Sequence, residues 1–279
     1  MDQLTLNTIG IVFNDSFEIA IEVKERLTNS LKKDAKIWAL DLDTVQKSGV
    51  ILDDTDLLIV IGGDGTILRI AGMAAPLKIP VLGINAGKLG YLAELDEKGL
   101  FTSLYKKLTM RSYLESRMMI EASVIQNDST KSKKLLALNE IVLASSQIAR
   151  LLRIKISIDR VKLGEYACDG IIVSTPTGST AYSLSSGGPI VSPQAKVIVI
   201  SPLAPHLGLP NSFVLAEDSI IELEVFSNER FLGLSADGYL ELEVTVNSKV
   251  ELRKSSVYAN FVRFNSPEYF FKRVNNKLM

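Results

Sequence analysis

The sequence predicts an α/β domain followed by a β-rich domain, and three observations lead to this expectation. In the first part of the chain, short apolar stretches alternate with amphipathic helical stretches, as in a doubly wound parallel sheet. From about Arg117, short segments with period-two alternation indicate strands of a β-sandwich-like domain. Five apolar residues, 57–61, end in a loop of three glycines around one carboxylate. We expect domains at residues 1–115 and 116–257, with a tail at 258–279 that packs on the body or on a neighbouring subunit.

The composition is that of a globular protein with a sizeable core. The chain has 279 residues, of which 47% are hydrophobic and 23% charged, and its formal net charge is −1. This charge gives no electrostatic case for nucleic acid or an anionic membrane as partner. No apolar run approaches the length that spans a bilayer and no signal-peptide pattern is present, so we expect a cytoplasmic protein. Its one cysteine, Cys168, excludes an intrachain disulfide and a cysteine-based zinc site.

Apolar periodicity places the elements of the first domain. The expected order is a strand at 8–13, a helix at 16–33, a strand at 36–40, a short helix at 43–47, the central strand at 57–61, a helix that begins at Thr66, a strand at 79–84, a second glycine-bearing loop at 85–92 and a helix at 96–108. The carboxyl ends of parallel strands meet at one edge of a sheet, so both loops should lie at that edge.

The first loop consists of Gly62, Gly63, Asp64 and Gly65, followed by Thr66. We expect the first two glycines to take conformations that a side chain would forbid and to let a ligand approach the main chain. The amides at the start of the following helix favour phosphate.

Asp64 needs an explanation of its own, because phosphate repels a carboxylate. It either accepts a proton from an attacking hydroxyl or faces a Mg²⁺ ion that is bound to the phosphates. The alternative is that Asp64 only caps the helix or makes the turn. The loop resembles the phosphate loop of a superfamily that contains NAD kinases, diacylglycerol and sphingosine kinases, and phosphofructokinases.

The second domain is expected to consist of short strands. They are placed at residues 119–126, 135–144, 151–158, 162–167, 170–174, 196–200, 220–226, 240–246 and 250–254. Asn139 and Glu140 stand at the head of an apolar stretch, where an amide and a carboxylate suit the two hydroxyls of a ribose, although an ordinary strand entrance has the same pattern. Arg150 either serves a phosphate or lies at the surface.

A hydroxyl-rich segment follows the strand expected at 170–174. The alternative to a binding segment is a flexible serine-glycine linker, but Pro176, Tyr182 and Pro189 stiffen this one. We expect a tight turn and a short helix that opens near Ser179 and Thr180, with amides and hydroxyls for a polar, flat ligand and Tyr182 as a stacking face.

Taken together, these motifs resemble the NAD kinase family in order and spacing. The resemblance covers about residues 8 to 255, and the stretch from Asp169 through Tyr182 to Pro189 is specific to that family. It implies that the first domain binds nucleotide and phosphate, that the second binds NAD, and that ATP or polyphosphate phosphorylates the 2′-hydroxyl of the adenosine ribose of NAD with a divalent metal such as Mg²⁺. It also implies a homodimer or homotetramer whose sites are completed across the interface. A diacylglycerol-type lipid kinase and a non-catalytic NAD-sensing module are the alternatives.

The resemblance also assigns roles to residues of this chain. Asp64 resembles the proton acceptor, Asn139 and Glu140 the ribose and nicotinamide-side contacts, and Asp169 the acid that faces the other half of NAD. Further positions that contact ligand are Gly65, Arg69, Arg150, Thr180, Ala181, Tyr182, Ser183, Leu184 and Ser185. Two departures concern substrate preference or subunit contacts: Asn211 and Ser212 replace an arginine-proline pair, and Tyr239 replaces a glutamine.

Overall fold

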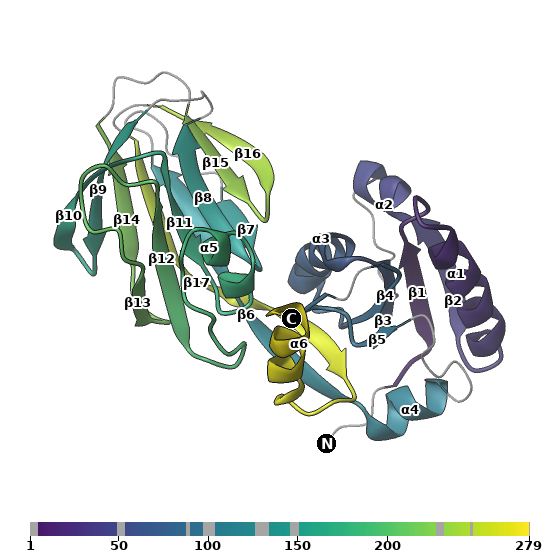
Figure 1. Cartoon of the computed structure of the whole chain (residues 1–279). Helices are drawn as coiled ribbons and strands as arrows, with labels where there is room; N and C mark the ends of the chain where they lie inside the picture. The colour runs from purple at the N-terminus through teal and green to yellow at the C-terminus, as the bar shows by residue number, and fades with distance from the viewer. Residues whose placement is uncertain are drawn as a thin grey trace. The chain divides into compact units, whose positions relative to one another are not determined.

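The chain divides into two units, shown in Figure 1. The first unit is Met1–Arg117 together with Tyr258–Met279, and the second is Met118–Val257. This computed structural model describes residues 5–48, 54–87, 90–96, 104–125, 134–145, 151–226, 232–245 and 248–278. None of the helices in these ranges is long and apolar enough to cross a membrane.

The first unit is built on a parallel sheet with strand order β17-β4-β3-β1-β2, with β5 beside β4. Its elements are β1 (Thr8–Phe13), α1 (Glu18–Leu31), β2 (Lys36–Asp41), α2 (Leu42–Ser48), β3 (Leu57–Gly62), α3 (Asp64–Ala74), the 3₁₀ turn η1 (Ala75–Leu77), β4 (Val81–Asn85), β5 (Leu95–Asp96), α4 (Leu104–Arg111), the C-terminal end of β17 (Lys249–Arg263) and α6 (Tyr269–Leu278). The expected α/β class is confirmed. The expected start of a helix at 96 is wrong, because Asp96 ends strand β5; residues 97–103 lie outside the described residues, and the helix α4 runs from Leu104 to Arg111.

Successive side chains along each strand point to opposite faces of this sheet, and both faces are apolar. One face carries Ile59, Ile61 and the apolar residues beside them on the adjacent strands, which form a core with the buried residues of α1 and α4. The opposite face carries Gly83, whose missing side chain leaves room for Ile67 of α3. Helices therefore cover both faces, and Figure 1 shows α1 and α3 on opposite sides of the sheet.

The strand ends of this sheet define one polar edge. In the parallel register Gly62 pairs with Asn85, so β3 and β4 end side by side. Strand β1 ends at this edge as well, because the backbone N–H of Asn14, the residue after β1, donates to the carbonyl oxygen of Ile61 at 3.0 Å. Both glycine-bearing loops begin at this edge, as their positions after the apolar strands predicted.

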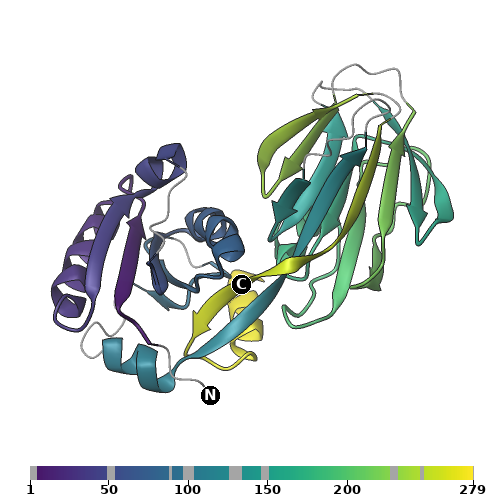
Figure 2. The same cartoon turned by 180° about the vertical axis from the view of Figure 1, so that it is seen from behind.

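The second unit is a sandwich of two antiparallel sheets. One sheet contains β10, β9, β14, β17, β6 and β7, and the other has the order β13-β12-β11-β8-β15-β16. The strands are β6 (Tyr113–Ile125), β7 (Lys134–Ala137), β8 (Glu140–Ser145), β9 (Leu152–Ile158), β10 (Val161–Cys168), β11 (Gly170–Ser174), β12 (Val197–Leu203), β13 (Phe213–Ala216), β14 (Ile221–Val225), β15 (Leu232–Ala236), β16 (Tyr239–Val244) and β17. Inward-facing residues of both sheets form one apolar core, and Figure 2 shows the sandwich from behind.

Several strands differ from the sequence-based expectation. The stretch 135–144 is not one strand but two, β7 and β8, separated at Leu138 and Asn139. Strands β13 and β15 were not expected. The tail begins as the last part of β17, where Phe261 pairs with Val81 of β4, and ends as α6, so it packs on the first unit.

Candidate active site

Asp64 opens helix α3 at the polar edge of the parallel sheet. The N-cap position is Gly63, and the helix begins at Asp64 rather than at Thr66, so the expected start was two residues late. Gly63 offers no side chain for capping, and Asp64 lies in the first helical turn. A carboxylate there is stabilised by the positive end of the helix dipole, while the free amides face the same edge.

The glycines of the loop have a steric role rather than the conformational role that we expected. Among the described glycines, positive φ occurs only at Gly187, Gly208 and Gly238, and Gly63 itself is extended. A Cβ on Gly62 would lie 2.7 Å from side-chain atoms of Thr66, so glycine there lets α3 pack against β3. A Cβ on Gly63 or Gly65 would meet no protein atom within 4 Å, which leaves the main chain open to a ligand.

The carboxylate of Asp64 is held by the second glycine-bearing loop. The backbone N–H of Tyr91 donates to Oδ2 at 2.6 Å, and that of Leu92 donates to Oδ1 at 3.0 Å. A Cβ on Gly90 would overlap Oδ1, so only glycine lets the loop come this close. Asp64 is therefore oriented by residues 27 and 28 positions away, which contradicts the alternative that it merely caps its own helix. Lys88 and Leu89 of this loop lie outside the described residues.

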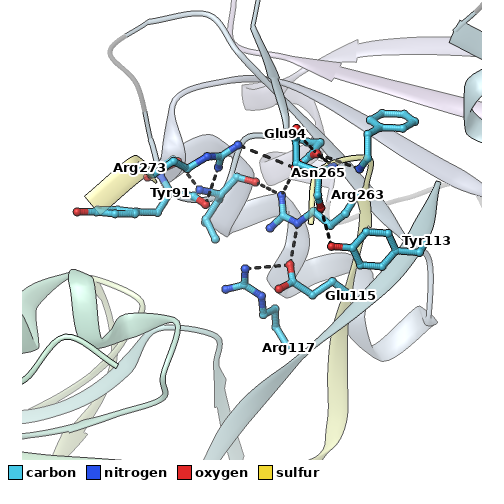
Figure 3. Close-up of polar contacts among 11 residues, drawn as sticks. Tyr91, Glu94, Tyr113, Glu115, Arg117, Arg263, Asn265 and Arg273 are labelled. Atoms are coloured by element: carbon cyan, nitrogen blue, oxygen red, sulfur yellow. Dashed lines mark hydrogen bonds and ion pairs between the residues drawn. The ribbon is translucent and has the colours of Figure 1, made fainter. Parts of the chain in front are cut away.

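Behind the loop lies a buried network of ion pairs that sequence reasoning missed (Figure 3). Arg263 pairs with Glu94 and with Glu115, at 3.4 and 2.7 Å, and Arg117 pairs with Glu115 at 2.9 Å. Arg273 of α6 pairs with Glu94 at 3.9 Å. Burial lowers the pKa of Arg117 to about 10, whereas the two arginines hold the pKa of Glu115 below its usual value in spite of its burial. The sequence signal was a charged residue directly after apolar ones, since Arg263 follows Phe261 and Val262 at the end of β17.

In the second unit, Asn139 and Glu140 stand at the start of β8, as the sequence predicted. Asp237 in the β15–β16 turn accepts backbone hydrogen bonds from Leu138, Asn139 and Glu140, at 2.9, 2.7 and 3.3 Å. The hydroxyl of Thr175 donates to the carbonyl oxygen of Leu138 at 2.6 Å. The head of β8 is thus held by residues that come later in the chain.

Glu140 is a buried acid with spare hydrogen-bonding capacity. Its side-chain Oε2 accepts no hydrogen bond from the part of the chain that the structure describes. The pKa of Glu140 is raised to about 7, mainly by burial and further by the charge of Asp237, while the backbone N–H of Tyr182 opposes both. A ligand hydroxyl or amide could satisfy the free oxygen.

The raised pKa of Glu140 predicts a pH-dependent stability. The folded state holds this proton up to about pH 7, whereas an unfolded glutamate, with a pKa of 4.5, loses it earlier. The stabilisation is complete below pH 4.5 and is lost as the pH rises through 7, by roughly 3 kcal/mol in total. We expect Glu140→Gln to remove this pH dependence from the free energy of unfolding, measured by urea titration with far-UV circular dichroism. An equal decline in both proteins would contradict the assignment.

The hydroxyl-rich segment forms the expected turn and short helix. The 3₁₀ turn η2 spans Gly178–Thr180 and the helix α5 spans Tyr182–Ser185. A Cβ on Gly178 would overlap the carbonyl oxygen of Asn139, so this turn packs directly on the head of β8. Tyr182 is 48% exposed and available for stacking. The turn, α5, Asn139 and Glu140 therefore gather at one end of β11 and β8, where Ser174 pairs with Glu140.

Ser212, one of the departures from the family pattern, is linked to this segment by hydrogen bonds. Ser212 contacts Ser201 through its hydroxyl at 2.7 Å, and Ser201 contacts Ser183 of α5 at 3.2 Å. The residue that replaces a family proline thus connects to the turn through a chain of hydroxyls. Tyr239, the other departure, is 42% exposed at the start of β16.

The remaining predicted site residues lie elsewhere. Asp169 is exposed between β10 and β11, at the end of β11 opposite to Ser174, and is therefore roughly 15 Å from Glu140 along the strand. Arg69 lies on α3, five positions after Asp64. Arg150 lies outside the described residues. No three of the described His, Cys, Asp and Glu side chains are placed so that they could hold a metal ion.

Comparisons with known proteins agree with this arrangement. The family model described as the ATP-NAD kinase N-terminal domain matches residues 20–113, and that of the ATP-NAD kinase C-terminal domain matches residues 138–264. An NAD kinase of Dehalococcoides mccartyi is 34% identical over 97% of this chain and 95% of its own length, and one of Caldanaerobacter subterraneus is 40% identical over 81% and 79%.

Solved structures give the same result. The structure of yeast NADH kinase complexed with NADH has a TM-score of 0.82 and 25% identity, and covers 98% of this chain and 87% of its own. An NAD kinase from Archaeoglobus fulgidus in complex with ATP has a TM-score of 0.74 and 26% identity, over 96% and 98%. This chain belongs to the NAD kinase family.

Proposed function

We propose that this chain is an NAD kinase that transfers the γ-phosphoryl group of ATP to the 2′-hydroxyl of the adenosine ribose of NAD, which produces NADP. The observation that carries the proposal is the carboxylate of Asp64, which lies at a helix start and is oriented by two backbone N–H groups. The matches to the family's N-terminal and C-terminal domain models support it. The related structures with NADH and with ATP support the two substrates.

Asp64 accepts the proton of the 2′-hydroxyl as that oxygen attacks phosphorus. Two of its lone pairs are used by Tyr91 and Leu92, and a carboxylate has about two more for the ribose hydroxyl. The open main chain at Gly63 and Gly65 and the first amides of α3 bind phosphate oxygens. Phosphoryl transfer depends mostly on such positioning and on charge stabilisation, so one base is sufficient.

The second unit binds the nucleoside parts of NAD in this proposal. Asn139 and Glu140 contact a ribose diol, and Tyr182 stacks on a flat ring. The turn residues provide further polar contacts from Thr180, Ala181, Ser183, Leu184 and Ser185. Arg69 and Arg150 are assigned to ligand phosphates or riboses by the family resemblance alone.

A divalent cation, Mg²⁺, completes the site in the proposed reaction. The oxygens of Asp64 already accept two hydrogen bonds, and no three acids among the described residues are placed to hold a metal ion, so the ion would be held mainly by ATP phosphates and water. When bound, Mg²⁺ neutralises charge that develops on the phosphates.

We further propose a homodimer or homotetramer in the cytoplasm. The family resemblance supports the assembly, since it implies sites that are completed across an interface, and Asp169 is exposed, as a residue that faces a neighbouring copy would be. Sedimentation velocity tests the assembly, and fractionation of cells tests the location.

The proposal is tested by supplying the purified protein with defined donors and acceptors. We expect NADP from NAD, ATP and Mg²⁺, detected with an NADP-specific dehydrogenase, and no phosphorylation of diacylglycerol. Polyphosphate in place of ATP and NADH in place of NAD define the donor and acceptor range in the same assay. Tight NAD binding without NADP from any donor would instead favour a non-catalytic NAD-sensing module.

A further inference from the structure

The C-terminal helix α6 contacts the loop that orients Asp64. We propose that Arg273 on α6 is a positioning residue for Asp64 that acts through the peptide group between Tyr91 and Leu92, with Arg263 of β17 as a second support. The proposal rests on the proposed function, which gives Asp64 its role in phosphoryl transfer.

One peptide group joins Arg273 to Asp64. Its carbonyl oxygen, on Tyr91, accepts a hydrogen bond from Nη1 of Arg273 at 2.9 Å. Its N–H, on Leu92, donates to Oδ1 of Asp64 at 3.0 Å. A cation on the carbonyl side polarises a peptide and strengthens its N–H as a donor. The guanidinium therefore acts on the carboxylate without touching it.

The next peptide group is held by a second arginine. Nη1 of Arg263 donates to the carbonyl oxygen of Leu92 at 2.8 Å. The N–H groups of Tyr91 and Leu92 thus bind Asp64, and the carbonyl groups of the same two residues are held by Arg273 and Arg263. Hydrogen bonds from charged donors are the stronger class, which suits them to hold a loop in one geometry.

The two arginines are themselves immobilised by Glu94. The side chains of Arg263, Arg273 and Glu94 are only 5%, 7% and 3% exposed. One oxygen of Glu94 also accepts the backbone N–H groups of Phe264 and Asn265, at 2.9 and 2.8 Å, and so ties the chain after β17 to the loop. Little side-chain freedom is left at this position, which makes the support rigid (Figure 3).

Other residues of α6 hold Tyr91 in place. The ring of Phe270 lies 6.1 Å from that of Tyr91, centroid to centroid, and Nζ of Lys277 lies 4.0 Å from the centroid of the Tyr91 ring. Arg273 lies between them in sequence and reaches the main chain of the same residue. The helix therefore fixes both the side chain and the carbonyl group of Tyr91.

The test separates positioning from binding and from general stability. We expect Arg273→Gln to lower kcat for NADP formation by about 10- to 100-fold, with KM for NAD and ATP changed less than about threefold, because a small displacement of Asp64 affects the chemical step. Arg273→Lys keeps the charge and should recover part of kcat. Hydrogen–deuterium exchange of the ligand-free protein should show faster exchange of the Tyr91 and Leu92 amides in Arg273→Gln.

Arg117→Gln provides the matched control. Arg117 belongs to the same buried network, in which it pairs with Glu115 at 2.9 Å. Its variant should keep kcat and the exchange of those two amides. An equal loss of kcat in both variants, or full activity of Arg273→Gln, would overturn the proposal. If the wild type itself makes no NADP, the proposed function fails first, and the proposal fails with it.

Discussion

Asp64→Asn is expected to lower the rate of NADP formation by about 10²–10⁴-fold while NAD still binds. The amide has lost the negative charge and the basic oxygen that accept the hydroxyl proton. In addition, Oδ1 and Oδ2 each accept a backbone N–H, so the new NH₂ group must face a donor on Leu92 or Tyr91. We therefore also expect a stability loss of about 1–3 kcal/mol. Steady-state kinetics, calorimetric titration with NAD and thermal unfolding measure the three effects.

Asp56→Asn is the matched control for this variant. Asp56 precedes β3, whereas Asp64 follows it, and Oδ2 of Asp56 also accepts two backbone N–H groups, from Asn7 and Thr8, at 2.7 and 2.9 Å. One oxygen accepts both bonds, so an asparagine oxygen can replace it. Asp56→Asn should form NADP at the wild-type rate. Wild-type activity in Asp64→Asn would show that Asp64 neither accepts the proton nor faces the metal ion.

Gly90→Ala should reduce kcat about 100-fold or more without unfolding the protein. The added methyl group would overlap the carboxylate of Asp64, and a displacement of about 1 Å at a reacting group costs about this factor. Gly90 is not among the described residues with positive φ, so the backbone itself accepts alanine. Kinetics together with a crystal structure of the variant would show whether Asp64 has moved.

Gly72→Ala is the corresponding control on α3. A Cβ there meets nothing within 4 Å, and the position is inside a helix, so alanine should raise the free energy of unfolding by about 0.5–1 kcal/mol and leave kcat unchanged. If Gly90→Ala were as active as Gly72→Ala, the close approach between the loop and Asp64 would have no part in the reaction.

The parallel half of the fold was predictable because its signals are local. Uninterrupted apolar runs separated by amphipathic stretches gave the strands and helices in order, and β1 has the bounds that its apolar residues predicted. The second unit was harder, because β13 and β15 have only four and five residues and β15 includes Gly233. The break between β7 and β8 depends on hydrogen bonds to Asp237, about 100 positions later, which no local pattern contains.

The candidate site, like the fold, was predictable only where its signals are local. The glycine loop, Asn139, Glu140 and the turn at η2 and α5 were found from motifs, because each is a contiguous stretch. The buried network was not found, because Glu94 and Arg263 are 169 positions apart and only the fold brings them together. The predicted role of the glycines was wrong in part, since sequence does not distinguish a glycine needed for its backbone angles from one needed for space.

The fate of the γ-phosphoryl group shows directly whether this protein phosphorylates NAD at the expense of ATP. Purified protein would be incubated with γ-³²P-labelled ATP, Mg²⁺ and NAD, in parallel with Asp64→Asn, and the dinucleotide isolated. We expect label in NADP, released by a phosphatase and located on the 2′-oxygen of the adenosine ribose, with a rate at least about 100-fold lower in the variant. Unlabelled dinucleotide, from a wild-type protein that binds both NAD and ATP, would contradict this expectation.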